Sequence, residues 1–388
     1  MSQTLVAAKA KTEHSRSSKT IYLPGLNGLR AIAAIAVVIS HITLGLEAFG
    51  LNSKIFGTDL EGNARGLDLA GNGVTIFFTL SGFLITYLLL KEKEVSPLKI
   101  KDFYIRRLLR IWPLYYLYFA VSVATLVIFG MDYVKSSIPF YIFLAANIPF
   151  ITGAIIPFVG HYWSLGVEEQ FYLFFPQIAR LSNKKLFRIS IFLIFFLLVL
   201  KMIFWVMDRK YHIGLPFTAI TVTRFHVMLI GVVGAMLYYQ KNKIFLAIAT
   251  NKITQAVAWG CILLIALNRF HIASVIDGEL ISVVSVFLII GQITKTNNII
   301  NLENKACDFI GKISYGIYVV HPLIIFYFSK LIGSFKSDAV INYIAIYVSI
   351  LAATIVVSYV SYEFYEKKFL KLKARYTTVK SSNTAGSL

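Results

Sequence analysis

The first long apolar run of the sequence carries two ionisable residues whose types and spacing could do chemistry. Arg30 and His41 both lie within LNGLRAIAAIAVVISHITLGL. If this run is a helix, the eleven-residue spacing makes about three turns, so both side chains lie on one stripe, about 16 Å apart. An ionisable group in hydrocarbon costs about 2.5 to 3.5 kcal/mol and usually marks a site or a pathway. A cation and a base aligned along one helix therefore predict chemistry inside a membrane.

Two adjacent acids, Glu168 and Glu169, lie in the aromatic segment HYWSLGVEEQFYL. Neighbouring helical residues point about 100° apart, so the two carboxylates should face different neighbours. Glu168 shares a face with Ser164 and Tyr172 at four-residue spacing, which suits a carboxylate that is held by hydroxyls and paired with a residue of the first run. The alternative is an interfacial acid that extends outward to the membrane surface.

A cluster of three arginines, Arg106, Arg107 and Arg110, precedes Trp112 at the predicted inner surface. Guanidinium groups match phosphate oxygens with two parallel hydrogen bonds, so the cluster could bind an anionic cosubstrate such as the phosphates of coenzyme A. Arginine beside tryptophan is equally typical of a simple topology anchor. The sequence leaves both interpretations open.

A later run begins with ISYGIYVVHP, where Ser314, Tyr318 and His321 fall on one helical stripe. Pro322 lacks a backbone donor and so frees the carbonyl of Tyr318. The pattern indicates a polar helix face that could be functional, although an intramembrane histidine can also be a hydrogen-bonded packing residue.

Two further motifs have less certain roles. Arg224 and His226 lie close to the outer end of another run, where a long side chain can reach the surface. The sequence LSGF, with Ser81 and Gly82, supplies small residues for close helix approach, so packing is the favoured interpretation.

The composition indicates the elements that must position these residues. The 388 residues are 57% hydrophobic and 15% charged, with a mean hydropathy of +0.71, which excludes an ordinary soluble globule and a disordered chain. The net charge of +19 could suggest nucleic acid, but the basic residues cluster between apolar runs, so positive-inside topology explains the charge better.

Ten apolar runs are each long enough, at about 20 residues, to span a membrane. They begin near Leu26, Gly73, Trp112, Trp163, Leu186, Phe217, Phe245, Leu280, Ile313 and Ile341. Residues 138–151 are shorter and contain two prolines, so we interpret them as re-entrant or interfacial. The even-numbered runs lead into loops rich in Lys and Arg, as a cytoplasmic N-terminus requires. The predicted fold is an all-α polytopic membrane protein with about ten transmembrane helices and both termini in the cytoplasm.

One membrane domain is predicted, over residues 21–370. It is flanked by a disordered cytoplasmic tail, residues 1–20, and by a basic cytoplasmic tail, residues 371–388. The two cysteines, Cys261 and Cys307, lie in or beside apolar runs and predict neither a disulfide nor a metal site.

Six segments together resemble the integral-membrane O-acyltransferases often called acyltransferase family three. They are GLRAIA from Gly28 on through His41, FFTLSGFLIT from Phe77, RRLLRIWP from Arg106, WSLGVEEQFY from Trp163, Arg224 with Gly231, and SYGIYVVHP from Ser314. Each segment is weak alone, but their order and spacing over nearly the whole chain are specific. The chain departs from the family pattern at Asn27, His226 and Lys368.

The resemblance implies transfer of an acyl group, usually acetyl from cytoplasmic acetyl-CoA, to a hydroxyl of a carbohydrate at the envelope of a bacterium. It places the chain in the inner membrane as a multi-pass protein, with the lipid bilayer, an acyl-CoA donor and a carbohydrate acceptor as partners. Acetyl-CoA is a cosubstrate, and neither a metal nor a nucleic acid is expected; the oligomeric state stays open.

The residues of the candidate site fall into three groups. For catalysis they are His41, Arg30 and Glu168; for the donor, Arg106, Arg107 and Arg110; and in supporting positions Glu169, Trp163, Ser164, Arg224, Tyr318, His321 and Ser81. His41 would act as general base or carry the acyl group itself, while Glu168 would orient it. The competing hypothesis is a transporter or flippase of a lipid-linked sugar, which would also use paired intramembrane charges.

Overall fold

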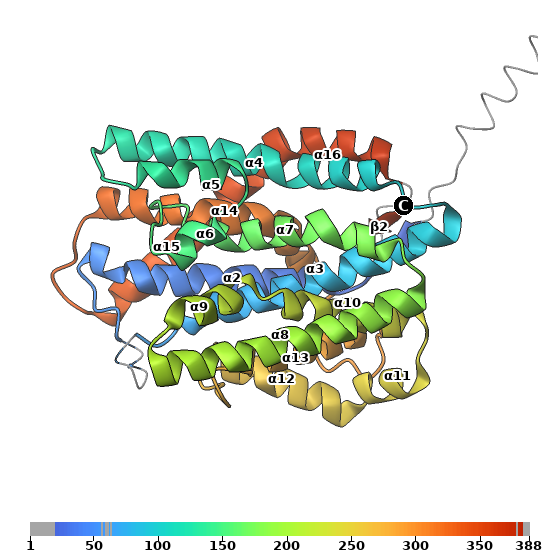
Figure 1. Cartoon of the computed structure of the whole chain (residues 1–388). Helices are drawn as coiled ribbons and strands as arrows, with labels where there is room; N and C mark the ends of the chain where they lie inside the picture. Colours follow the sequence, from blue (N-terminus) through green and yellow to red (C-terminus); the bar gives the residue numbers. More distant parts are fainter. Residues whose placement is uncertain (1–19, 56, 59–61, 63, 378, 383–388) are drawn as a thin grey trace, which may run out of the picture.

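The structure is a bundle of helices, because in lipid each backbone polar group must find its partner within its own segment. The computed structural model describes residues 20–55, 57, 58, 62, 64–377 and 379–382. Figure 1 shows the long helices side by side along one common direction. The first half contains β1 (Thr20–Tyr22), α2 (Leu26–Gly45), α3 (Asp68–Val95), α4 (Ile100–Ile128), α5 (Ile138–Ile142), α6 (Asn147–Ile151), α7 (Tyr162–Ala179) and α8 (Asn183–Tyr211).

The second half continues the same bundle. It contains α9 (Gly214–Thr223), α10 (Phe225–Tyr239), α11 (Lys243–Ala249), α12 (Lys252–Ala266), α13 (Asp277–Thr294), α14 (Lys305–Ile332), α15 (Val340–Ser361), α16 (Lys367–Lys373) and β2 (Lys380–Ser382). Short 3-10 turns occupy Leu46–Phe49, Lys135–Ser137 and Ala374–Tyr376, and one π-helical turn occupies Tyr362–Glu366.

Eight helices in the described part of the chain are long and apolar enough to cross a membrane, or nine if α11 and α12, which meet at 55°, form one span. The protein is therefore a polytopic membrane protein. Ten spans were predicted, and the tenth is α7, which is not among these nine. It carries the polar residues Glu168, Glu169 and Gln170 near its middle. Because α7 packs against α3, α4 and α8, its polar side chains face other helices.

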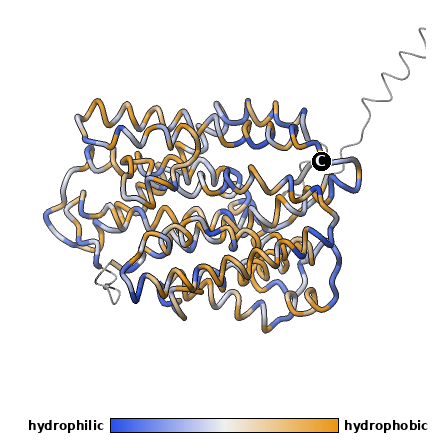
Figure 2. Tube along the Cα trace, viewed as in Figure 1, coloured by the Kyte–Doolittle hydropathy of each residue, from blue (hydrophilic) through white to orange (hydrophobic). Residues whose placement is uncertain are grey.

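The centre of the bundle is α3. Its most apolar window is 83% buried, whereas the corresponding window of α8 is only 11% buried. Figure 2 shows apolar residues along the lengths of the helices and hydrophilic residues gathered at the two ends of the bundle. This distribution is expected for a protein whose outer surface faces lipid, and it places α2, α3, α10 and α14 where their polar residues can form an enclosed site.

Helices α3 and α10 cross at two glycines. A Cβ added to Gly82 would lie 2.1 Å from the carbonyl oxygen of Met228, and one added to Gly231 would lie 2.2 Å from the carbonyl oxygen of Thr79. No side chain fits at either position, so the two backbones pack directly against each other. The packing role predicted for the segment around Gly82 is confirmed.

We expect Gly82→Ala to destabilise the folded protein by about 1 to 3 kcal/mol, because the new methyl group forces α3 and α10 apart. Thermal unfolding in detergent would measure the effect. Gly260→Ala in α12 is the matched control, since a Cβ there has nothing within 4 Å. Equal unfolding temperatures for the two variants would contradict the close crossing.

The segment predicted to be re-entrant or interfacial forms α5 and α6, with five residues each. Five helical residues rise only about 7.5 Å, which is too short to cross a membrane. Tyr141 anchors the segment, since its side chain is fully buried and its hydroxyl accepts a hydrogen bond from the backbone N–H of Ile156 at 3.2 Å.

An ionised cluster attaches the lipid-facing helix α8 to the bundle. Lys201 Nζ lies 2.7 Å and His226 Nε2 lies 2.8 Å from Oε1 of Glu279 on α13. All three side chains are buried. Glu279 of α13 thus supplies the carboxylate that lies beside His226 of α10.

The two ends of the described chain lie at the same end of the bundle. Strands β1 and β2 pair in parallel, with Ile21 opposite Ser381, and α16 lies beside the first turns of α4 (Figure 1). The predicted disordered tail, residues 1–20, falls outside the described residues except for its last position. The predicted basic tail begins inside α16, so its first residues are helical.

Candidate active site

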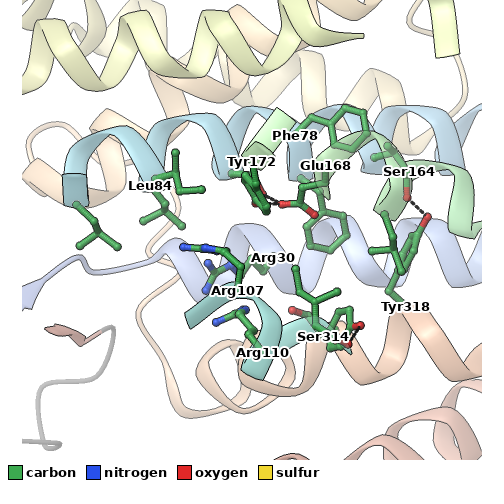
Figure 3. A pocket seen from close by; sticks show the side chains of 18 of the residues that line it. Arg30, Phe78, Leu84, Arg107, Arg110, Ser164, Glu168, Tyr172, Ser314 and Tyr318 are labelled. Carbon is green, nitrogen blue, oxygen red and sulfur yellow. Dashed lines mark hydrogen bonds between the residues drawn. The ribbon is translucent and has the colours of Figure 1, made fainter. Parts of the chain in front are cut away.

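A cavity of about 150 Å³ opens between helices α2, α3, α4, α7, α14 and α16. Figure 3 shows three arginines gathered at one end of it and the pair Ser164 and Tyr318 at the other. Its polar lining residues are Arg30, Ser81, Arg107, Arg110, Ser164, Glu168, Tyr172, Ser314, Tyr315, Tyr318 and Lys373. Six separate elements thus converge on one polar space in an otherwise apolar bundle.

Glu168 lies in the wall of this cavity between the two ends. It accepts hydrogen bonds at Oε1 from the hydroxyls of Ser81 and Tyr172. The prediction that hydroxyls hold this carboxylate is confirmed, although Ser164, one of the two expected partners, bonds elsewhere. No ion pair between described residues joins Glu168 to Arg30. The two side chains line the same cavity, however, and attract each other across it.

The cationic end of the cavity is formed by Arg30 of α2 and by Arg107 and Arg110 of α4. Arg107 lies over the rings of Phe103 and Tyr172, at 5.6 and 5.0 Å, and its buried Nε has no partner among the described residues. The arginines were expected where a loop meets a span, but α4 already begins at Ile100. They therefore project from one helix at fixed positions.

A second cavity, of about 310 Å³, shares this cationic end and extends toward α16. Arg106 lines it, but its guanidinium is largely occupied. It pairs with Glu92 at 2.9 Å and donates from Nη1 to the carbonyl oxygen of Tyr376 at 2.8 Å. Arg107 and Arg110 line both cavities, so they are better placed than Arg106 to meet a ligand.

The other end of the first cavity is closed by two hydroxyls. Ser164 and Tyr318 lie 2.5 Å apart, and the Tyr318 hydroxyl also donates to the carbonyl oxygen of His161 at 2.8 Å. Tyr318 is the lining residue that contacts the histidines beyond, with ring centroids 5.2 Å from His161 and 6.1 Å from His321. His41 itself is not in the cavity lining.

Three histidines form a cluster behind Tyr318. The rings of His41 and His321 stack with centroids 4.8 Å apart, and His161 lies 6.5 Å from His41 and 5.2 Å from His321. These residues come from α2, α14 and the residue preceding α7. The described residues contain no group of three or more His, Cys, Asp or Glu side chains that could hold a metal ion.

Hydrogen bonds fix the tautomer of His41 when the imidazoles are neutral. His321 Nδ1 lies 3.1 Å from the carbonyl oxygen of Ile317, which can only accept, so Nδ1 carries the proton. His321 Nε2 is then an acceptor for His41 Nδ1 at 2.6 Å. The lone pair of His41 is left on Nε2, which can take a proton or attack a carbonyl carbon. His41 is thus hydrogen-bonded to His321, whereas Glu168, which was expected to orient it, bonds to Ser81 and Tyr172.

Six predicted site residues lie outside the lining of the first cavity: His41, Arg106, Trp163, Glu169, Arg224 and His321. Arg224 occupies a left-handed conformation, φ 43°, between α9 and α10, and donates to the carbonyl oxygens of Thr221 and Gly71 and to the hydroxyl of Thr75. Its guanidinium lies 5.6 Å from the ring of Trp163. These contacts tie α3, α7 and α9 together, and no ion pair between described residues joins Arg224 to a carboxylate.

Glu169 points away from Glu168, as the helical geometry predicted. It accepts a hydrogen bond from Trp112 Nε1 at 3.4 Å, and its other oxygen is buried without a partner among the described residues. The two adjacent acids therefore lie in separate environments.

Sequence reasoning missed three members of these clusters, His161, Lys201 and Lys373. His161 opens the same motif as Glu168, and a histidine directly before a span could have been singled out. Lys201 is a lone cation in the run FFLLVLKMIFW, which was a readable signal. Lys373 had no signal, because it stands among other basic residues of the expected tail.

Comparison with known proteins identifies the family of this chain. The family model described as Acyltransferase domain matches residues 23–363. A protein of Staphylococcus aureus (strain COL) named "Putative O-acetyltransferase" is 31% identical over 390 residues, which cover 92% of this chain and 59% of that protein. O-acetyltransferase OatA of Staphylococcus aureus (strain NCTC 8325 / PS 47) is 32% identical over 168 residues, 40% of this chain and 24% of that protein. No solved structure matches.

The chain thus spans 59% of the length of the first of these relatives. The matched region includes the helices that carry Arg30, His41, Glu168 and His321. The protein is therefore a member of the acyltransferase family of multi-pass membrane proteins.

Proposed function

We propose that this protein is an O-acetyltransferase of the bacterial inner membrane. It moves an acetyl group from cytoplasmic acetyl-CoA to a hydroxyl of a carbohydrate of the cell envelope or of an exported carbohydrate. The observation that carries this proposal is the cavity. The arginines of α4 lie at its cationic end, and Tyr318, at its other end, contacts the histidine cluster. The names of the relatives support the acetyl group, and the basic loops support a cytoplasmic position for the cationic end.

In this proposal the anionic part of the donor binds Arg107 and Arg110, and its thioester arm extends along the cavity past Glu168. His41 Nε2 takes the proton of the acceptor hydroxyl as the oxygen attacks the thioester carbonyl. The C–S bond breaks, and the proton passes from the imidazolium to the departing thiolate. Alternatively, His41 Nε2 attacks the thioester carbonyl first, and the C–S bond breaks to release the thiolate. The acceptor hydroxyl then attacks the acetyl-imidazole, the bond from Nε2 to the acetyl carbon breaks, and the hydroxyl proton passes to the thiolate.

His41 lies outside the cavity lining and Tyr318 contacts the other two histidines, so in this proposal the acetyl group passes the Tyr318 side chain. The hydroxyl of Tyr318 is held by Ser164 and the His161 carbonyl, and both contacts are single hydrogen bonds that a rotamer change can break. Tyr318 would thus keep water from the thioester until the acceptor is bound.

The proposal is tested with purified protein in lipid nanodiscs, acetyl-CoA labelled in the acetyl group, and envelope glycans. We expect label on the glycan, together with a mass increase of about 42 Da, one acetyl group. The His41→Ala variant should transfer none. Movement of a lipid-linked sugar across the membrane of proteoliposomes, without label on the sugar, would instead support the transporter hypothesis. A transporter would also use paired intramembrane charges.

A further inference from the structure

We propose that the C-terminal segment, Lys367–Ser382, is a working part of the donor site, and that Lys373 binds the anionic part of the donor. This inference deepens the proposed function and rests on it. The sequence alone assigned residues 371–388 to a tail without a role. The structure instead folds α16 and the following turn over the cationic end of the two cavities.

The segment is held in place by contacts at several points. The π-helical turn at Tyr362–Glu366 joins α15 to α16, and such turns are frequent at functional sites. Tyr365 donates its hydroxyl to the carbonyl oxygen of Pro113 at 3.2 Å, and Arg106 holds the carbonyl oxygen of Tyr376 at 2.8 Å. Val379 is 5% exposed, and strand β2 pairs with β1. The segment is thus attached to α4 and to β1.

Lys373 is the residue by which this segment enters the site. It lines both cavities, together with Arg107 and Arg110. Its ammonium makes no ion pair with any described carboxylate. Of the neighbouring cations, Arg107 lies over the ring of Tyr172 and Arg106 pairs with Glu92, whereas no described carboxylate occupies Lys373, which is therefore available to bind a ligand.

The charge of the lining indicates what that ligand is. Four cations, Arg30, Arg107, Arg110 and Lys373, line the first cavity, and Glu168 is its one carboxylate. Like charges so close together repel one another strongly in a medium of low dielectric constant. An anion with several charges removes this repulsion, and the phosphates of a thioester donor supply them while the thioester arm reaches toward Tyr318.

The test compares two lysines of the same helix, Lys373→Gln and the exposed control Lys371→Gln. Two donors are used: acetyl-CoA, and S-acetyl-N-acetylcysteamine, a short thioester without phosphates. We expect Lys373→Gln to raise KM for acetyl-CoA about tenfold or more with little change in kcat, and to leave the short donor unaffected. Lys373→Arg should restore most of the affinity, and Lys371→Gln should behave as wild type.

Equal KM values for Lys373→Gln and Lys371→Gln, or equal losses with both donors, would overturn the assignment. Unfolding temperatures of the variants in detergent identify any general loss of structure. If Lys373→Gln is destabilised, KM for acetyl-CoA is compared between Lys373→Arg and the wild type instead. Equilibrium binding of labelled coenzyme A is measured separately from transfer. Weakened binding in Lys373→Gln supports the role of Lys373 even if acetyl transfer fails, whereas no binding by the wild type would overturn it.

Discussion

Replacing His41 with alanine is expected to reduce acetyl transfer by about a hundredfold to ten-thousandfold, the usual contribution of a positioned acid or base. The loss should appear in kcat, because KM for acetyl-CoA depends on the cationic end of the cavity, where Arg30 lies about 16 Å from His41 along α2. The variant should still reach the membrane and fold, since His41 is partly exposed and its side chain hydrogen-bonds to one described side chain, that of His321. Transfer rates with labelled acetyl-CoA would measure the effect.

The control for this substitution is His271→Ala. His271 is 62% exposed in its side chain and pairs with Asp277 near the start of α13, away from the cavity. The His271→Ala variant should transfer acetyl at the wild-type rate. If His41→Ala retained more than about a tenth of the activity while His271→Ala retained all of it, His41 would be a packing residue, and the proposed chemistry would need another base.

The second large effect is expected at His321, which acts through His41 and is a positioning residue. In His321→Leu nothing accepts the proton of His41 Nδ1, so the imidazole can move it to Nε2 and lose the reactive lone pair. We expect kcat to fall about a hundredfold or more, with KM for acetyl-CoA nearly unchanged.

His321→Gln separates the hydrogen-bonding role of His321 from its volume. The amide oxygen of glutamine can occupy the position of Nε2 and accept from His41 Nδ1, so this variant should recover a large part of the lost rate. The pH dependence of kcat should also return toward that of the wild type. Equal activity of the leucine and glutamine variants would show that His321 only fills space.

Much of the site could be predicted from local spacing. Arg30 and His41 were placed on one stripe, and the structure puts Arg30 in the cavity and His41 in the histidine cluster. The divergence of Glu168 and Glu169 followed from the 100° step of a helix. Both inferences concern residues within one helix, where the geometry is fixed by the backbone.

Contacts between distant segments could not be predicted in the same way. His41 and His321 are separated by 280 residues, and nothing in either helix specifies that their rings stack. The number of membrane spans was harder for a related reason. Helix α7 is less apolar than its neighbours because it is enclosed by them, and hydropathy cannot distinguish an enclosed helix from an interfacial one.

The ion pair between Lys201 and Glu279 has a consequence for the rotation of α8 about its own axis. Only four positions of this 29-residue helix are buried, Leu186, Ser190, Ile194 and Lys201. Between Ile189 and Met207 the remaining residues are all apolar, and lipid offers no preference between one apolar face and another. The ammonium of Lys201 can reach the carboxylate of Glu279 at only one rotation of α8 about its axis. This single ion pair therefore determines that Leu186, Ser190 and Ile194 face the bundle.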